Sequence, residues 1–403
     1  MADPDLSAVF AEEWGRVVAT LIGVTGDWDL AEEAAAEAVA RALAAWPRDG
    51  APRSPGAWLT TAARNHAFNV LRRRRAEAGK LRELAATPVR TDNPDERLAL
   101  MFTCCHPALP MEGRVALTLR TLTGMSTADI AAAFLVGEPA LAQRIVRAKR
   151  KITEAGIPYR VPPEHLMPER LPAVLAVLYL LFNEGYSASC GPGPLRPDLT
   201  GEAVHLARML ARLMPDEPEV LGLLALMLLH DSRRDARVDA RGRLVSLEDQ
   251  DRSRWRAGDI AEGLALVETA LRRRSPGPYQ IQAAIAACHA GPATAAGTDW
   301  AQIAALYGVL EGMAPSPVVA LNRAVAVAMA EGPEAGLALL GELDGDERLG
   351  GYHLLPATRA DLLRRLGRDR EAADAYRRAL GLAATRADRE FLRARLSEVD
   401  PPQ

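Results

Sequence analysis

The sequence is poor in the residues that build sheets and disulfide frameworks. Aromatic residues make up 5% of the 403 residues and there are four cysteines, whereas 49% of the chain is apolar and rich in alanine and leucine. Few aromatics with abundant Ala and Leu favour helices over sheets. Four cysteines in this length do not make a disulfide framework. The chain is long enough for two or more domains, so we expect an all-α protein of several domains.

Long apolar runs and the common catalytic signatures are also missing. No stretch is apolar enough to span a membrane. The first residues, MADPDLSAVFAEEW, lack the basic start and apolar core of a signal peptide. We therefore expect a soluble cytoplasmic protein with no membrane partner. The chain contains no phosphate-binding loop, nucleophile elbow or HExxH motif, which argues against an enzyme and gives no reason to expect a cofactor.

The net charge of −3 conceals a strong asymmetry. Residues 1–50 carry 3 basic and 10 acidic side chains, residues 51–160 carry 18 and 9, and residues 161–403 carry 28 and 33. The middle segment includes four consecutive arginines, Arg72 to Arg75. Such a local excess of positive charge suits a polyanionic partner, above all nucleic acid. A basic face that only meets solvent is the alternative.

Two helices are predicted before the arginines. In DLAEEAAAEAVARALAAW (29–46) apolar residues recur about every four positions, and acidic residues crowd the first half, where the helix dipole favours them. The segment PRDGAPRSP (47–55) should break this helix, because it holds three prolines and a glycine. Ser54 can cap the next helix, with Pro55 in its first position. That helix should reach the arginines.

A linker and a second helical segment follow. Residues 77–97 are predicted to be a flexible linker, and a helix should begin near Asp95. Cys104, Cys105 and His106 stand side by side, but adjacent thiolates fit one tetrahedral metal poorly, and no CxxC motif or second histidine cluster lies nearby. We expect buried apolar thiols and no metal site.

Residues 126–152 have the pattern of a helix-turn-helix. Ser126 can cap a short helix, STADIAAAF, with Asp129 near a capping-box position. After the turn LVG (135–137), a second helix over about 138–152 should bury Leu141, Ile145, Ala148 and Ile152, and expose Gln143, Arg144, Arg147, Lys149, Arg150 and Lys151. A basic second helix of this kind can enter a major groove. The alternative is a helical hairpin packed for structure alone.

Residues 159–403 show a recurring helical spacing. Positions at offsets of four and three recur about every 34 residues, in the sets 303/307/310, 337/341/344 and 372/376/379, although the second set matches poorly in residue type. The same offsets occur upstream in 203/207/210 and 263/267/270. In LLRRLGRDREAADAYRRAL, Gly367 should turn between two helices. This period is similar to that of tetratricopeptide (TPR) repeats, although residues 232–256 interrupt it. An irregular helical bundle is the alternative.

Together these segments resemble an extracytoplasmic-function (ECF) sigma factor of bacterial RNA polymerase, of the group with a long C-terminal TPR-like extension. Residues 10–75 are similar to sigma region 2 through DLAEEAAAEAVARAL and WLTTAARNHAFNVLRRRR. Residues 98–153 are similar to region 4 through FTCCHPAL, RVALTLR and FLVGEPALAQRIVRAKRKI, and LYLLFNEGYSAS (178–189) resembles the start of that extension. The resemblance implies a region 2 bundle (1–76), a linker (77–97), a region 4 helix-turn-helix (98–158) and a TPR-like domain (159–403).

The resemblance also implies partners and site residues. The partners would be core RNA polymerase, through its β′ clamp helices and β flap, and promoter DNA, with a protein or peptide as a possible ligand of the TPR-like domain. The residues facing polymerase would be Asp29, Glu32, Glu33, Glu37 and Arg41. Those near the −10 element would be Arg53, Arg64, Asn65, His66, Arg72, Arg73, Arg74 and Arg75. Those near the −35 element would be Gln143, Arg144, Arg147, Lys149 and Arg150.

The implied function is promoter-specific transcription initiation, with the extension regulating activity in cis. Region 2 would hold unstacked −10 bases, for which Trp58, His66 and Phe68 are candidate stacking residues. One alternative is a one-component transcription regulator with a helix-turn-helix and a TPR-like sensor, which would not need the basic segment of residues 58–75. Another is a TPR scaffold whose basic segment touches RNA.

Overall fold

The computed structural model describes residues 6–73, 94–133, 136–187, 195–240 and 242–400. Its described part is helical, apart from short turns and an isolated antiparallel bridge between Val238 and Leu244. The chain divides into two compact units, residues 1–188 with 196–210, and residues 211–403 with 189–195. Within the described residues, no helix has the length and apolar character needed to cross a membrane. The all-α prediction is confirmed.

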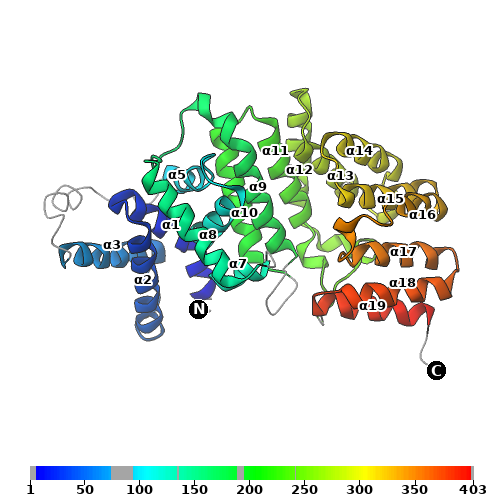
Figure 1. Ribbon diagram of the computed structural model, residues 1–403, viewed down its shortest axis with the longest axis horizontal. Coiled ribbons are helices and arrows are strands. Elements are labelled where there is room, and N and C mark those ends of the chain that lie inside the picture. The colour runs from blue at the N-terminus through cyan, green and yellow to red at the C-terminus, as the bar shows by residue number, and fades with distance from the viewer. Residues whose placement is uncertain (1–5, 74–93, 134–135, 188–194, 241, 401–403) are drawn as a thin grey trace. The chain divides into compact units, whose positions relative to one another are not determined.

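The N-terminal module consists of α1 (Leu6–Thr25), α2 (Trp28–Asp49) and α3 (Pro55–Arg73), which pack on one another (Figure 1). Asp27 caps α2 by accepting hydrogen bonds from the amides of Asp29 and Leu30. The buried stripe of α2 is mostly alanine, which allows its neighbours to approach closely. The helix breaks later than predicted. Pro47 lies inside the last turn of α2, where it removes a single intrahelical hydrogen bond, and the chain turns at Gly50, whose φ is +79°.

The helix-turn-helix module follows, with α5 (Pro94–Cys104), α6 (Met111–Thr123), α7 (Thr127–Ala133) and α8 (Glu138–Glu154). Most of the predicted linker lies outside the described residues, and Pro94 to Arg97 already belong to α5. A short 3-10 turn, η1 (Glu164–Leu166), precedes α9 (Met167–Tyr186), which contacts both α5 and α6. The first unit therefore reaches past the sequence boundary at 159, because α9 and most of α10 (Pro197–Leu213) belong to it.

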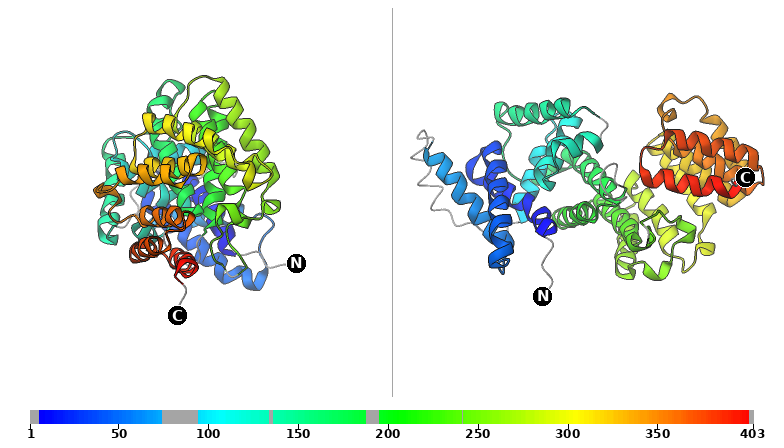
Figure 2. Two further views of the ribbon diagram at one scale, coloured as in Figure 1. Left: turned by 90° about the vertical axis from the view of Figure 1, so that its right-hand side faces the viewer. Right: turned by 90° about the horizontal axis from the view of Figure 1, so that it is seen from below.

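The second unit is a run of antiparallel helices. It contains α11 (Pro218–Asp231), α12 (Ala257–Arg272), α13 (Pro278–Ala290), α14 (Trp300–Met313), α15 (Pro317–Glu331), α16 (Pro333–Glu342), α17 (Leu354–Arg365), α18 (Asp369–Leu382) and α19 (Arg386–Val399). Each helix packs on the next, and Figures 1 and 2 show α17 to α19 (orange to red) side by side. As predicted, Gly367 turns the chain between α17 and α18, with φ of +70°. The segment interrupting the repeats forms the 3-10 turns η2 (Arg234–Ala236), η3 (Leu247–Asp249) and η4 (Arg252–Arg254).

The recurring small residues mark where neighbouring helices come closest. A Cβ on Gly263 would lie 2.7 Å from the Leu229 side chain, and Ala372 and Ala379 are fully buried in the core of the last three helices. In α16 the predicted register 337/341/344 is wrong by one residue. The buried positions there are Gly336 and Leu340, and a Cβ on Gly336 would lie 2.4 Å from that of Ala328.

Candidate nucleic-acid interface

The four acidic side chains of α2 that were predicted to face polymerase each lie close to a basic or histidine side chain of the chain itself. Lys149 Nζ of α8 lies 2.7 Å from Glu32 Oε1 and 2.9 Å from Asp29 Oδ1. Arg120 of α6 lies 3.4 Å from the other carboxylate oxygen of Glu32. The Glu32 and Lys149 side chains are each only 13% exposed, whereas Asp29 is 89% exposed. The Lys149–Glu32 ion pair is thus shielded from solvent, while the contact with Asp29 lies at its rim.

Glu33 and Glu37 of α2 lie close to side chains of their own module. Glu33 Oε1 lies 3.7 Å from His66 Nε2 of α3, so a predicted polymerase-facing residue lies beside a predicted −10 residue. Glu37 accepts a hydrogen bond of 2.9 Å from Arg41 Nε, one helical turn later. Both partners in this last pair are well exposed, and the pair contributes little to stability. Glu33, Glu37 and Arg41 therefore remain accessible for an external partner.

Helix α3 carries the predicted −10 residues along its outer face. Asn65, Arg72 and Arg73 are exposed, and Arg53 is exposed in the loop before the helix. The guanidinium of Arg64 stacks over the ring of Phe68, with 5.0 Å to the centroid. Arg74 and Arg75 lie outside the described residues. The exposed part of α3 is therefore polar and basic, as binding along a phosphate backbone requires.

Trp58 packs inside the N-terminal module. Its ring meets Trp46 edge to face at 5.4 Å, and Trp46 in turn stacks on Phe10 at the same distance. Trp46 is 5% exposed. This aromatic cluster holds α1, α2 and α3 together, so Trp58 acts as a core residue in this arrangement.

The helix-turn-helix forms as its capping residues predict. Ser126 Oγ accepts a hydrogen bond of 3.0 Å from the Asp129 amide and lies 2.7 Å from its carboxylate, which fixes the start of α7. Gly137 precedes α8 with Pro139 in the first turn, and Leu135 of the predicted turn lies outside the described residues. The four residues predicted to anchor α8 are all buried: Leu141, Ile145, Ala148 and Ile152.

The basic residues of α8 divide between two sides of the helix. Gln143, Arg147 and Arg150 are exposed and Arg144 is half-buried. Arg144, Arg147, Arg150 and Lys151 line a hollow of about 540 Å³ between α8 and the loop before α6. This concentration of cations on one helix suits contacts to DNA phosphates and base edges.

Lys149 was predicted to be exposed with these cations, and this prediction is wrong. Its side chain points to α2, because an ion pair with Glu32 offsets the loss of hydration on that side of the helix.

The two modules also pack through backbone and apolar contacts that sequence reasoning missed. A Cβ on Gly15 of α1 would lie 2.3 Å from the carbonyl oxygen of Leu122 in α6, so only glycine fits this crossing. Tyr159 Oη lies 2.9 Å from Ala19 O and 3.2 Å from Glu96 O, and its ring meets Trp28 edge to face. Burial raises the pKa of the Tyr159 phenol well above its usual value, helped by nearby Cys104 and Glu96.

The adjacent cysteines are buried thiols, as predicted. Cys104 and Cys105 are fully buried, and their Sγ atoms lie 3.5 Å and 3.7 Å from the hydroxyls of Thr121 and Thr118. Burial raises the pKa of both thiols, that of Cys105 to about 12, so both stay protonated and unreactive at neutral pH. His106 points elsewhere, since its Nδ1 accepts a hydrogen bond from the Ala108 amide. Among the described residues, no group of three His, Cys, Asp or Glu is placed to hold a metal ion.

Comparison with known proteins places these modules in known families. Residues 10–77 match the model of Sigma-70 region 2, and residues 99–152 match that of Sigma-70, region 4. Residues 170–271 match a family of unknown function, DUF6596. Over 98% of its length the chain is 46% identical to the uncharacterized protein R00370 of Rhizobium meliloti (strain 1021), covering 95% of that protein. The two modules and the C-terminal extension therefore occur together in a relative of nearly equal length.

Proposed function

The chain belongs to the extracytoplasmic-function sigma factors that carry a long C-terminal extension, and we propose that it binds core RNA polymerase and directs initiation at specific promoters. Families of this kind are DNA-binding transcription factors without enzymatic activity. In this proposal α2 binds the β′ clamp helices through Glu33, Glu37 and Arg41, with Asp29 and Glu32 joining after rearrangement. The α3 helix engages the −10 element, and α8 engages the −35 element.

One observation carries this proposal. A chain that matches both regions presents exposed cations on α3 and on α8, the two helices assigned to DNA, and carboxylates on α2, the helix assigned to protein. Within α8, Gln143 and Arg144 lie one to two turns from the helix start, where side chains of a recognition helix reach base edges. Arg72 and Arg73 would neutralise phosphates and contribute affinity without sequence preference.

In the free protein, the N-terminal module and the helix-turn-helix module pack against each other, and we call this arrangement closed. The −10 and −35 positions are about 25 base pairs apart, or roughly 85 Å along B-form DNA at 3.4 Å per base pair. Modules joined by the Gly15 crossing and the Lys149–Glu32 ion pair could not reach both elements at once. We therefore propose that polymerase binding to α2 releases Lys149, separates the modules and frees α8 for DNA.

The start of the extension supports a role in cis. Arg97 of α5, which is 4% exposed, forms an ion pair with Glu202 of α10. At the end of α9 a Cβ on Gly185 would lie 2.6 Å from the Thr200 amide nitrogen, so α9 and α10 meet closely there. We propose that the extension controls activity through this contact with the helix-turn-helix module, and that its repeats bind a protein or peptide partner in the cytoplasm.

Runoff transcription with purified core polymerase tests the proposal. Genomic fragments bound by the reconstituted holoenzyme would supply the template. We expect a transcript of defined length only when this chain, core polymerase and template are all present. A one-component regulator would instead bind DNA without core polymerase and give no transcript with core polymerase alone, and that result would overturn the proposal.

A further inference from the structure

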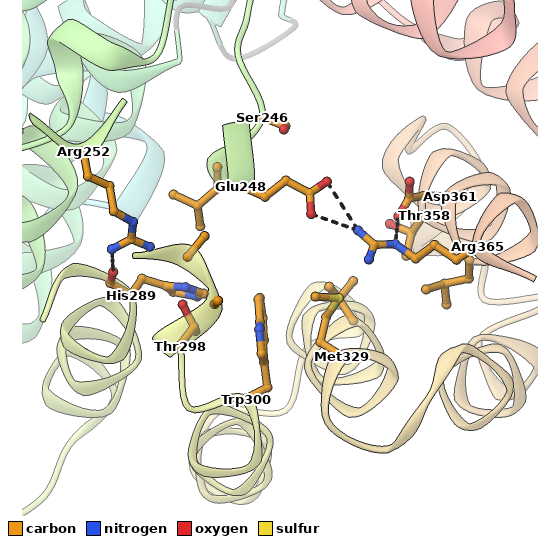
Figure 3. A pocket seen from close by; sticks show the side chains of 15 residues that line it. Ser246, Glu248, Arg252, His289, Thr298, Trp300, Met329, Thr358, Asp361 and Arg365 are labelled. Atoms are coloured by element: carbon orange, nitrogen blue, oxygen red, sulfur yellow. Dashed lines mark hydrogen bonds and ion pairs between the residues drawn. The ribbon is translucent and has the colours of Figure 1, made fainter. Parts of the chain in front are cut away.

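The second unit contains a cavity that the proposed function leaves unused. It has a volume of about 460 Å³, which is typical of small-molecule sites. The insertion that interrupts the repeats supplies one wall, through Leu247, Glu248 and Arg252 (Figure 3). Helices α13, α14, α15 and α17, with residues 295–298 before α14, supply the rest. Trp300 and Met329 project into the space from below (Figure 3), and Val325 and Leu362 also line it. The cavity is thus mainly apolar with charged groups at its two ends.

At one end of the cavity the charges cancel. Arg365 lies 2.8 Å from a carboxylate oxygen of Asp361 and 3.2 Å from one of Glu248 (Figure 3). Its guanidinium is therefore fully neutralised, and the Glu248 contact ties the insertion to α17. An anionic ligand has no reason to prefer this end.

At the other end one cation keeps its charge. Arg252 Nη1 donates hydrogen bonds of 2.8 Å to two carbonyl oxygens, those of His289 and Pro292, and its guanidinium lies over the Trp255 ring at 4.4 Å. Among the described residues, no carboxylate lies within ion-pair distance of Arg252. Its Nε and Nη2 have no hydrogen-bond partner there either. A half-buried guanidinium with free donors is a site for an anion.

His289 adds a polar group next to this cation. Its imidazole meets the Trp300 ring edge to face at 5.1 Å, and its Nδ1 atom is buried without a hydrogen-bond partner. Burial, with the nearby cations Arg233 and Arg252, lowers the pKa of His289 to about 4. The imidazole is therefore neutral at cellular pH. A buried polar atom without a partner is costly, and a bound ligand could satisfy it.

We propose that this cavity binds a small organic carboxylate with an aromatic or aliphatic body. The carboxylate accepts hydrogen bonds from Arg252 beside His289, and the body packs on Trp300, Val325 and Met329. Of the lining arginines in the described part of the chain, Arg252 has no carboxylate partner and therefore selects one negative charge, while the apolar walls select an uncharged body. Occupancy would join the insertion to α14 and α15, so the ligand would stabilise the second unit.

Calorimetric titration of the full-length protein with naphthoate, indoleacetate and octanoate tests the site. Naphthamide serves as the uncharged counterpart of naphthoate. We expect at least one acid to bind with a Kd below about 1 mM, and the amide to bind at least tenfold more weakly than naphthoate. Arg252→Gln should weaken acid binding tenfold or more. Arg254→Gln is the matched control, since Arg254 is exposed in the same 3-10 turn but does not line the cavity, and it should leave binding unchanged.

Arg252 also donates hydrogen bonds to two backbone carbonyls, so Arg252→Gln could unfold the protein. A second variant therefore tests the site independently. Val325→Phe fills the cavity from its apolar wall and should abolish binding in a protein with an unchanged circular dichroism spectrum. The proposal is overturned if none of the three acids binds, if naphthamide binds as well as naphthoate, or if a folded Val325→Phe retains the affinity. Failure here would leave the promoter function untouched, since no residue of this cavity belongs to α2, α3 or α8.

Discussion

Lys149 of the helix assigned to the −35 element lies 2.7 Å from Glu32 of the helix assigned to polymerase, and each side chain is only 13% exposed. In the free chain, a residue predicted to bind DNA thus pairs with a residue predicted to bind polymerase. Because a charge left buried without a partner is costly, breaking this pair requires both side chains to reach water or new partners. Polymerase for Glu32 and DNA phosphates for Lys149 would provide such partners.

The Lys149–Glu32 pair should be energetically coupled. We expect a double-mutant cycle with Glu32→Gln and Lys149→Met, measured by urea unfolding, to give a coupling free energy of about 1 kcal/mol, within the usual range for residues in contact. The exposed Arg150–Glu154 pair on α8 is the control and should couple by no more than about 0.5 kcal/mol. Equal coupling in both pairs would mean that the contact with α2 does not hold the modules together.

Charge reversal on α2 should weaken polymerase binding. Glu33→Lys with Glu37→Lys should reduce affinity for core polymerase at least tenfold, since it places cations where the proposed interface needs anions. Fluorescence titration with core polymerase measures the effect. Glu268→Lys with Glu371→Lys makes the same change in net charge on exposed sites of the second unit and should have no effect. Unchanged affinity in the α2 variant would remove this helix from the interface.

Two arginines should affect DNA binding in different ways. Arg144→Ala should cost about 1–3 kcal/mol at the preferred −35 sequence and relax selectivity there, because a base contact is lost. Arg73→Ala should weaken binding to all sequences alike and reduce the salt dependence by about one unit of slope, because a phosphate contact is lost. Binding assays with holoenzyme at several salt concentrations separate the two effects. A −35 preference that survives Arg144→Ala would show that α8 is not the reading helix.

The closed arrangement should be sensitive to one methyl group. Gly15→Ala places a Cβ 2.3 Å from the Leu122 carbonyl, so α1 and α6 must move apart, and we expect faster amide hydrogen exchange along both helices. Gly308→Ala in α14 is the control, because no atom lies within 4 Å of the added Cβ, and it should stabilise the protein by about 0.5–1 kcal/mol. Unchanged exchange in Gly15→Ala would contradict this packing of the two modules.

The second unit should lose stability in mild acid. The pKa of His289 falls to about 4 on folding, and burial also holds the pKa of His230 well below its usual value, with help from nearby arginines. Between about pH 6.5 and 4 the unfolded chain therefore binds more protons than the folded one, and the free energy of unfolding falls as pH falls.

For His289 the loss should approach about 1.4 kcal/mol for each pH unit in that window, with full stability above about pH 6.5. Urea unfolding of the wild type and of His289→Gln at pH 7 and pH 5 measures it, and the variant should show a shallower pH dependence. Parallel profiles would exclude His289 as a source of the effect.

Local sequence patterns were sufficient to predict several buried positions, a helix cap and a turn. The buried residues Leu141 and Ile152, the Ser126 cap and the Gly367 turn all depend on neighbours within a few positions, so helical periodicity and capping chemistry predict them. The same reasoning failed at Lys149, because its partner Glu32 lies in another module and periodicity along α8 carries no information about α2.

Other features depend on contacts between helices, which local sequence patterns do not predict. In α16 either of two adjacent registers fits a loose repeat, and only the close approach of Ala328 selects Gly336. No sequence pattern marks Gly15, whose close approach to the Leu122 carbonyl joins α1 to α6. The cavity of the second unit combines Arg252 from the insertion with Trp300 from α14 and Val325 from α15, so no local sequence motif predicts it.

The ion pair between Arg97 and Glu202 bears on how this protein can be shortened. A chain that stops at the sequence boundary near residue 160 would lose α9 and α10, leaving a buried guanidinium without its carboxylate and apolar faces of α5 and α6 in water. We expect such a protein to be destabilised, so a loss of function in it would not report on regulation by the extension. Truncation after Leu213 keeps both helices and removes the repeats alone. Deletion at that point would therefore separate the contribution of the later helices from the stability of the first unit.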